Sequence, residues 1–291
     1  MTTAPAVPLV VTTRADLSDS LRRLRDQGST VALVPTMGAL HAGHEALLAT
    51  AATVADAVVV SVFVNPLQFG AGEDLDRYPR TLDDDVALAG RAGAALVFAP
   101  TVAEMYDGGP PSVRVHAGPL GDVLEGAARP GHFDGVLTVV LKLLGLVRPE
   151  AVVLGAKDAQ QLVLVRRMVH DLDVPVRVVE VPTVREADGL AVSSRNRFLA
   201  PADRARAAVL SQALRAGADA VSRGPAAVRT AALEVLAGEP AFALDYCELV
   251  DPVTLAPADP EGRAALLLVA GRLGSTRLVD AATVTLPGVE A

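Results

Sequence analysis

The sequence reads Val31-Ala32-Leu33-Val34-Pro35-Thr36-Met37-Gly38-Ala39-Leu40-His41-Ala42-Gly43-His44 where an apolar run meets a small-residue loop and two histidines. The apolar run predicts a buried strand over Val31 to Pro35. The segment that follows the loop, Gly43 to Ala55, is typical of a helix. Phosphates bind at the loop of such a strand–loop–helix unit, so this stretch indicates nucleotide chemistry.

Alternation of strand-like and helix-like segments continues along the chain. We predict strands at Val31 to Pro35, Val58 to Asn65, Leu96 to Ala99, Ala151 to Leu154 and Val176 to Val181. Helices are predicted at Gly43 to Ala55, Thr81 to Gly93, Val136 to Val147 and Ala159 to Leu172. Repeated β–α units favour an α/β fold with a doubly wound, parallel, Rossmann-like sheet. Two long irregular stretches, Asn65 to Arg80 and Tyr106 to Phe133, interrupt the pattern, and loops of that length are usually either functional or disordered.

The pattern changes after Pro201. Two Ala- and Arg-rich helices are predicted at Ala202 to Ser222 and Ala226 to Leu236, followed by strands at Ala243 to Val250, Ala264 to Ala270 and Thr276 to Val279. This order predicts a second, smaller α+β domain. We place the Rossmann-like domain at residues 1–184 and the C-terminal domain at residues 185–291.

Composition excludes several classes of protein. The chain has 291 residues, is 51% hydrophobic and carries a formal net charge of −8, without the basic face of a nucleic-acid-binding protein. Its apolar runs are too short to span a membrane, and Met1 to Val10 lacks the pattern of a secretory signal. A single cysteine, Cys247, fits a reducing compartment, so we expect a cytoplasmic protein that binds neither nucleic acid nor membranes.

The two histidines are the first candidates for chemistry. His41 and His44, three positions apart, can lie on one face of a first helical turn. We expect the first N–H groups of that helix to lack internal partners and to attract an anion. The alternative is a pair of surface histidines that only cap the helix. No P-loop and no dinucleotide fingerprint occurs, and the other histidines and the lone cysteine do not follow with the spacing of a zinc site.

Further polar residues follow the predicted strands. Gln68 lies just beyond Val58 to Asn65, and Gln161 lies near Lys157-Asp158 beyond Ala151 to Leu154. Lys157 is one of only two lysines beside 24 arginines, and its place after a strand favours a ligand contact over a solvated loop lysine. Ser193-Ser194-Arg195-Asn196-Arg197 offers hydroxyl and guanidinium groups that suit phosphates, although a solvated linker would also fit.

Four motifs occur in the order found in the pantoate–β-alanine ligase (pantothenate synthetase) family, and the resemblance covers almost the whole chain. They are Pro35-Thr36-Met37-Gly38-Ala39-Leu40-His41-x-Gly-His44, Phe63-Val64-Asn65-Pro66-x-Gln68-Phe69, Gly155-x-Lys157-Asp158-x-Gln160-Gln161 and Ser193-Ser194-Arg195-Asn196. The His-x-Gly-His element is shared by nucleotidylyltransferases at large, whereas the second and third motifs are specific to the ligase.

The resemblance implies an enzyme that uses ATP to activate pantoate as pantoyl-adenylate, with release of pyrophosphate. β-Alanine then displaces AMP to give pantothenate. His44 matches the family's proton donor, and we assign His41 and Lys157 to catalysis with it. The C-terminal domain is expected to form a lid over the site. The residues matched to ATP contacts are Met37, Gly38, Ala39, Leu40, His41, Ala42, Gly43, His44, Gly155, Ala156, Lys157, Asp158, Val184, Val192, Ser193, Ser194 and Arg195.

The same resemblance assigns Gln68, Gln161 and Asn65 to pantoate and β-alanine. Asp84 and Asp85 align with an acidic pair linked to Mg²⁺ in some members, and a homodimer is implied. The chain departs from the family pattern at Ala156, Ala159 and Leu88, where family members carry larger or polar side chains. Two alternatives follow: another nucleotidyltransferase of the His-x-Gly-His superfamily, or an idle nucleotide-binding relative.

Overall fold

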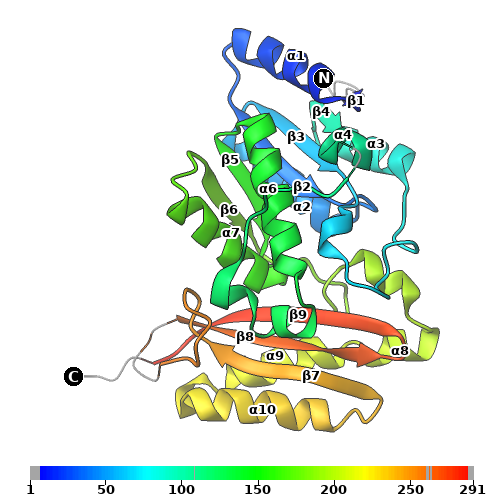
Figure 1. Cartoon of the computed structure of the whole chain (residues 1–291). Coiled ribbons are helices and arrows are strands. Elements are labelled where there is room, and N and C mark those ends of the chain that lie inside the picture. The colour runs from blue at the N-terminus through cyan, green and yellow to red at the C-terminus, as the bar shows by residue number, and fades with distance from the viewer. Residues whose placement is uncertain (1–6, 108, 260–261, 263, 288–291) are drawn as a thin grey trace, which may run out of the picture. The chain divides into compact units, whose positions relative to one another are not determined.

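The computed structural model of the chain, shown in Figure 1, describes residues 7–107, 109–259, 262 and 264–287. It contains two compact units. The first unit comprises Met1–Gly155 and Leu164–Val181, and the second comprises Ala156–Val163 and Pro182–Ala291. The segment Ala156–Val163 therefore belongs to the second unit although it lies within the sequence of the first. The domain boundary after residue 184 stays a prediction.

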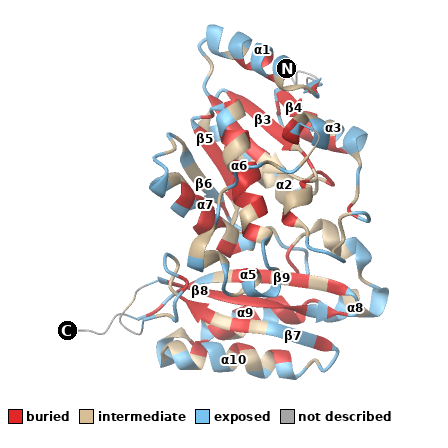
Figure 2. Ribbon diagram, viewed as in Figure 1, coloured by how far each residue is buried: buried red, intermediate tan, exposed pale blue. Residues whose placement is uncertain are grey.

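A six-stranded parallel sheet forms the centre of the first unit, in the order β1-β4-β3-β2-β5-β6. The strands are β1 (Leu9–Val11), β2 (Val31–Thr36), β3 (Ala57–Val62), β4 (Leu96–Phe98), β5 (Ala151–Gly155) and β6 (Arg177–Val181). Parallel pairing of strands joined by helices confirms the predicted Rossmann-like class. Figure 2 shows that the central strands are almost entirely buried.

Helices cover both faces of this sheet. Helices α2 (Ala42–Val54) and α3 (Leu82–Arg91) place Leu48, Ala51 and Ala89 in one apolar cluster with the β2 residues Ala32 and Val34. The alternate β2 residues are equally buried on the opposite face, where α6 (His132–Val147) contacts β2 and α1 (Arg14–Asp26) contacts α6. Successive strand residues point to opposite faces, so each face needs its own helical layer.

The strand order reverses between β2 and β5. Strands β3 and β4 lie on one side of β2, and β5 and β6 lie on the other. Open α/β sheets bind ligands beyond the carboxyl ends of the strands at such a reversal. Here those ends lead into the loop Met37 to His41 and into Gly155, which are two of the segments expected to contact ATP.

Several boundaries differ from the predicted ones for local reasons. Strand β3 ends at Val62 rather than Asn65, because the Asn65 side chain caps the short helix η1 (Pro66–Gln68) by accepting from Leu67 N–H. Helix α6 begins at His132, earlier than expected. Elements β1 and α1 are not predicted from the pattern, since β1 has three residues at the sheet edge and two of them are exposed.

The second unit contains an antiparallel sheet of β7 (Phe242–Val250), β8 (Ala264–Leu273) and β9 (Thr276–Thr285). Its apolar core joins these strands to α9 (Val209–Asp219) and α10 (Pro225–Ala237). The single long helix expected from Ala202 is wrong: α8 (Pro201–Arg206) ends before Ala207, and α9 begins at Val209. Among the residues that the structure describes, no helix has the length and apolar character needed to cross a bilayer.

The remaining elements complete the two units. In the first unit they are α4 (Val102–Tyr106), η2 (Gly118–Gly121) and α5 (Glu125–Ala128). Elements η3 (Ala156–Asp158), η4 (Ser194–Phe198) and η5 (Val221–Arg223) lie in the second unit, and α7 (Ala159–Asp171) runs from the second unit into the first.

Candidate active site

The loop that follows β2 folds back on itself through the two histidines. His41 is the N-cap of α2, and its Nδ1 accepts from Gly43 N–H at 3.2 Å. His44 Nδ1 accepts from His41 N–H at 3.2 Å, which completes a reciprocal capping box. A backbone N–H only donates, so both Nδ1 atoms are unprotonated and each neutral ring carries its proton on Nε2. The ring centroids lie 4.1 Å apart, so the capping box brings the two imidazoles close together.

The expectation that the first N–H groups of this helix lack internal partners is wrong. Besides the two N–H groups held by imidazole nitrogens, His44 N–H donates to the carbonyl of His41, and Gly38 N–H donates to Thr36 Oγ1 at 3.1 Å. The histidines therefore do cap the helix, as the alternative reading held. The N–H groups of His41, Gly43 and His44 are thus engaged within the protein, which leaves the imidazole rings as candidate donors to an anion at this turn.

A buried carboxylate holds the middle of the same loop. Asp85 of α3 accepts from Ala39 N–H at 3.1 Å and from Leu40 N–H at 2.7 Å, and also from the Thr81 hydroxyl at 3.3 Å. Only 2% of Asp85 is exposed. The carboxylate oxygens are thus occupied by donors from the chain itself, so Asp85 is poorly suited to the Mg²⁺ ligand role expected of it.

The neighbouring Asp84 is exposed. Within the described part of the chain, no group of three or more His, Cys, Asp or Glu side chains has the arrangement of a metal site. Of the expected pair, Asp85 does not fit as a magnesium ligand, because donors of the chain itself occupy its carboxylate.

Gln68, the residue expected to contact both carboxylic substrates, lies beside the loop. Its Nε2 donates to Met37 Sδ at 3.2 Å, and its Oε1 accepts from Asn65 Nδ2 at 3.0 Å. Asn65 is held in turn by Gly135 O and by the Tyr106 hydroxyl, whose pKa is raised by burial. Three residues predicted from the motifs, Met37, Asn65 and Gln68, are thus joined by side-chain hydrogen bonds.

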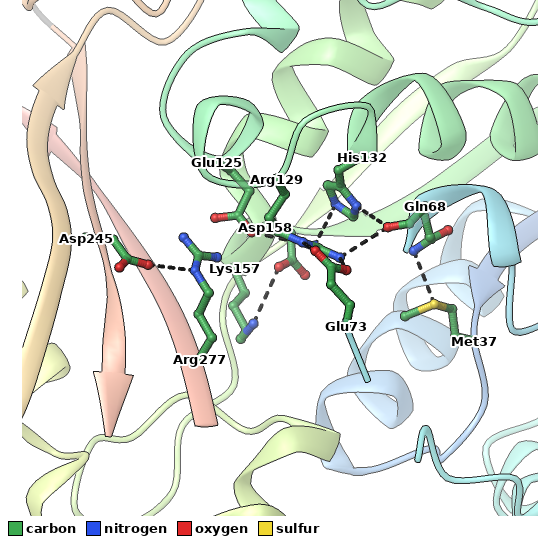
Figure 3. Close-up of polar contacts among 10 residues, drawn as sticks. All are labelled: Met37, Gln68, Glu73, Glu125, Arg129, His132, Lys157, Asp158, Asp245 and Arg277. Carbon is green, nitrogen blue, oxygen red and sulfur yellow. Dashed lines mark hydrogen bonds and ion pairs between the residues drawn. The ribbon is translucent and has the colours of Figure 1, made fainter. Parts of the chain in front are cut away.

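Sequence reasoning missed a cationic network that holds the backbone of Gln68. Arg129 binds both carboxylate oxygens of Glu73 and donates from Nη2 to Gln68 O at 3.2 Å. His132 donates from Nδ1 to the same carbonyl at 2.8 Å, and its Nε2 accepts from Arg129 Nη1 at 3.0 Å. Figure 3 shows these side chains converging on Gln68. The signal in the sequence is Arg129-Pro-Gly-His132, which lies inside the irregular stretch Tyr106 to Phe133, where no single residue was predicted to belong to the site.

The network fixes the charge state of its members. Burial and the adjacent Arg129 cation lower the pKa of His132 to about 4, so this ring is neutral at neutral pH. Burial alone would raise the pKa of Glu73, but hydrogen bonds and charge from Arg129 lower it overall. A neutral His132 beside an ion pair is required for the observed bonds, because its Nε2 accepts from a cation.

We predict that His132 makes the protein sensitive to acid. Between about pH 6.5 and pH 4 the unfolded chain binds a proton that folded His132 does not. The free energy of unfolding therefore decreases, by up to about 3 kcal/mol, as the pH is lowered through this range. Denaturant unfolding at about pH 7 and about pH 5 measures this. The pH dependence should shrink in His132→Asn and persist in His170→Asn, a control at an exposed histidine. Equal pH dependence in all three proteins would contradict the assignment.

The second unit collects the other expected ATP segments. Elements η3, which contains Lys157, and η4 both lie against β9. Lys157 Nζ lies 3.4 Å from Asp158 Oδ1, and its side chain is one-fifth exposed. Gln161 is half-buried in the first turn of α7, next to the buried Gln160. The lysine and Asp158 appear in Figure 3 as a local ion pair within this unit.

A short antiparallel turn brings the last two predicted segments together. Val192 N–H donates to Val184 O at 2.9 Å, and Arg185 pairs with Ala191 across the same turn. Arg185 binds both carboxylate oxygens of Asp280 in β9, with the shorter bond at 2.6 Å. Ser193 caps η4 by accepting from Arg195 N–H at 3.3 Å. Three motifs distant in sequence, at 156–158, 184 and 192–195, are therefore organised around one strand.

Comparisons with known proteins extend over this whole arrangement. The family model described as Pantoate-beta-alanine ligase matches residues 9–283. A pantothenate synthetase of Mycobacterium sp. (strain JLS) is 59% identical over 266 residues, which cover 91% of this chain and 84% of the relative. One from Leifsonia xyli subsp. xyli (strain CTCB07) is 57% identical over 260 residues, covering 89% and 90%.

Solved structures agree with these matches. The crystal structure of pantothenate synthetase from Thermus thermophilus has a TM-score of 0.89 and 49% identity, covering 94% of this chain and 98% of that one. A pantoate-beta-alanine ligase from Francisella tularensis, complexed with beta-gamma ATP and beta-alanine, has a TM-score of 0.77 and 30% identity, covering 94% and 97%.

Proposed function

Because this chain belongs to the pantoate-beta-alanine ligase family, it is a ligase of pantothenate biosynthesis, and we propose that it joins its substrates through pantoyl-adenylate. The condensation of pantoate with β-alanine is the reaction of the family. ATP is its energy source, and the Francisella relative that was solved with an ATP ligand and β-alanine supports this. The match over residues 9–283 carries the proposal, and the Met37–Gln68 contact supports a shared site for nucleotide and acid.

Two displacements make up the proposed reaction. In the first, a pantoate carboxylate oxygen attacks the α-phosphorus of ATP and pyrophosphate leaves. In the second, the amine of β-alanine attacks the acyl carbon, the acyl–oxygen bond breaks, AMP leaves and the amine loses a proton. Negative charge grows on phosphate oxygens during the first step, so hydrogen-bond donors fixed in advance lower its barrier.

His41 and His44 supply such donors. Their Nδ1 atoms accept from backbone N–H groups, so the proton of each ring lies on Nε2, and we propose that Nε2–H turns toward the phosphates when ATP is bound. Gln68 and Gln161 offer amides to the carboxylate and hydroxyl groups of pantoate. Asn65, which was expected to contact the substrate too, is buried and its side chain is bound within the protein, so it acts by holding Gln68. Arg129 and His132 both donate to the backbone carbonyl of Gln68, and so they hold its uncharged side-chain amide in place.

The segments of the second unit are proposed as the remaining ATP contacts. Lys157 and Arg195 provide cations, and Ser193 and Ser194 provide hydroxyl groups. Lid closure by this unit stays a prediction. Assembly into a homodimer is also a prediction, and light scattering in solution checks it. Magnesium is expected as the usual companion of ATP, but the enclosed Asp85 does not fit as its ligand, so no step is assigned to it. ATP chemistry and the unpaired Cys247 support a cytoplasmic location.

One assay with each substrate omitted in turn tests the proposal. We expect AMP and pyrophosphate to be released when ATP, pantoate and β-alanine are all present, and pyrophosphate release without β-alanine to stop after about one turnover per site. A stable nucleotidylated product would favour another nucleotidyltransferase. ATP binding without pyrophosphate release would favour an idle relative, which the small residues Ala156 and Ala159 in the third motif would then explain.

Lys157 tests the contribution of the second unit. We predict that Lys157→Ala slows adenylate formation by about a hundredfold, because a cation at the leaving phosphates is lost. Single-turnover release of pyrophosphate measures the step directly. Lys157→Arg keeps the charge and should retain more of the rate than alanine does. A single-turnover rate equal to that of the unaltered protein would make Lys157 a surface lysine.

A further inference from the structure

The loop between β2 and α2 adopts a backbone conformation that it cannot hold cheaply by itself. Gly38 has φ +83°, and the next residue, Ala39, has φ +51° although it carries a Cβ atom. An L-residue in this left-handed region is disfavoured, and such a residue persists only where the surroundings determine its conformation. Neither glycine nor a side chain of the loop itself explains why Ala39 stays there.

Asp85 supplies the missing constraint. Its Oδ2 accepts from Ala39 N–H at 3.1 Å and its Oδ1 accepts from Leu40 N–H at 2.7 Å, so one carboxylate grips two consecutive amides. Thr81 donates to Oδ1 from the N-cap position of α3. The carboxylate lies in the first turn of that helix, where the helix dipole favours negative charge.

The packing around this carboxylate also leaves little room for a metal ion. A Cβ added to Gly38 would lie 2.9 Å from Asp85 Oδ2 and 3.0 Å from Val62 Cγ1, so the loop backbone covers the carboxylate closely. Only 2% of Asp85 is exposed, whereas the adjacent Asp84 is exposed. A Mg²⁺ ion keeps several water molecules in its octahedral shell, which a carboxylate enclosed by backbone N–H groups does not accommodate.

We propose that Asp85 is a positioning residue that holds residues 38–40 in their left-handed turn and so sets His41 and His44 for catalysis, rather than a ligand of Mg²⁺. The turn ends directly at His41, the N-cap whose ring and carbonyl organise the start of α2. Releasing Ala39 and Leu40 would therefore shift the imidazoles that face the phosphates. The link to catalysis rests on the proposed function, but the hydrogen bonds from the two amides to Asp85 do not.

Amide hydrogen exchange in the ligand-free protein with EDTA tests the grip itself. We expect the amide protons of Ala39 and Leu40 to be strongly protected without any metal ion or nucleotide. Protection of at least one of them should fall at least tenfold in Asp85→Asn, because the new amide group presents a donor to one of the two N–H groups. It should remain in Asp84→Asn, the matched control. Rapid exchange at both amides in the unaltered protein, or protection that appears only when Mg²⁺ is added, would overturn the proposal.

Kinetics separate positioning from metal binding. Asp85→Asn should lower kcat by about ten- to a hundredfold through misplacement of the imidazoles. The Mg²⁺ concentration that gives the half-maximal rate should stay unchanged. Thr81→Val, which removes one donor to the same carboxylate, should move kcat in the same direction by a smaller factor. If Mg²⁺ in excess restored Asp85→Asn, or if Asp84→Asn shifted the Mg²⁺ requirement equally, the pair would be metal ligands and the proposal would fail. Failure of the proposed ligase reaction would leave the exchange result intact, so the two hypotheses fail separately.

Discussion

Replacing His44 by alanine should lower the rate of adenylate formation by about a hundred- to a thousandfold while ATP affinity changes by less than about threefold. In the proposed reaction, the ring donates from Nε2 to charge that develops on phosphate oxygens, and that charge is greatest in the transition state. Its Nδ1 has a second role, because it accepts from His41 N–H within the capping box of α2. Alanine removes both functions at once.

His44→Asn separates these two roles. Asparagine keeps an acceptor close to the position of Nδ1 but has no donor at the position of Nε2, so it should restore thermal stability without restoring the rate. Rapid-quench measurement of pyrophosphate release gives the rate, and ATP titration gives the affinity. Comparable losses of rate and ATP affinity in His44→Ala would contradict a role in the transition state.

Gly135→Ala should destabilise the protein by about 3 kcal/mol and weaken pantoate binding, because the added methyl group meets backbone atoms. A Cβ at Gly135 would lie 2.6 Å from Gln68 N and still closer to the Leu67 carbonyl group. Helix α6 and η1 cannot simply separate, since Asn65 Nδ2 bonds both Gly135 O and Gln68 Oε1. The displaced residue would be Gln68 itself.

Gly145→Ala is the matched control in the same helix. A Cβ there has no heavy atom within 4 Å, and Gly145 is exposed, so alanine should stabilise the protein by about 0.5–1 kcal/mol through helix propensity. Denaturant unfolding and pantoate titration of both variants check the pair. Similar stability and affinity in Gly135→Ala and Gly145→Ala would show that the α6–η1 contact does not position Gln68.

Much of the first unit could be predicted because its signals are local. The apolar strand before Pro35, the β-branched run from Val58 and the alternation with helical segments each depend on neighbouring residues, and the parallel sheet follows from their order. The same holds for Met37, Asn65 and Gln68, which follow strands that end at one edge of the sheet.

The remainder depends on contacts between distant residues. Asp85 looks like one of three acidic residues at a helix start, and nothing local shows that it accepts from Ala39 and Leu40, more than forty residues earlier. Arg129 and His132 likewise gain their meaning only from Gln68. The N–H groups at the start of α2 were expected to face an anion, yet the spacing of His41 and His44 also suits a capping box, which is what forms.

The fate of the pantoate carboxylate oxygens tests the central claim most directly. Pantoate with heavy oxygen in its carboxylate, incubated with ATP, β-alanine and this protein, should pass one heavy oxygen atom to AMP for each pantothenate formed, because that atom bridges acyl carbon and phosphorus in the adenylate. Mass spectrometry of AMP and pyrophosphate gives the result. Unlabelled AMP, or heavy oxygen in pyrophosphate, would contradict a pantoyl-adenylate intermediate.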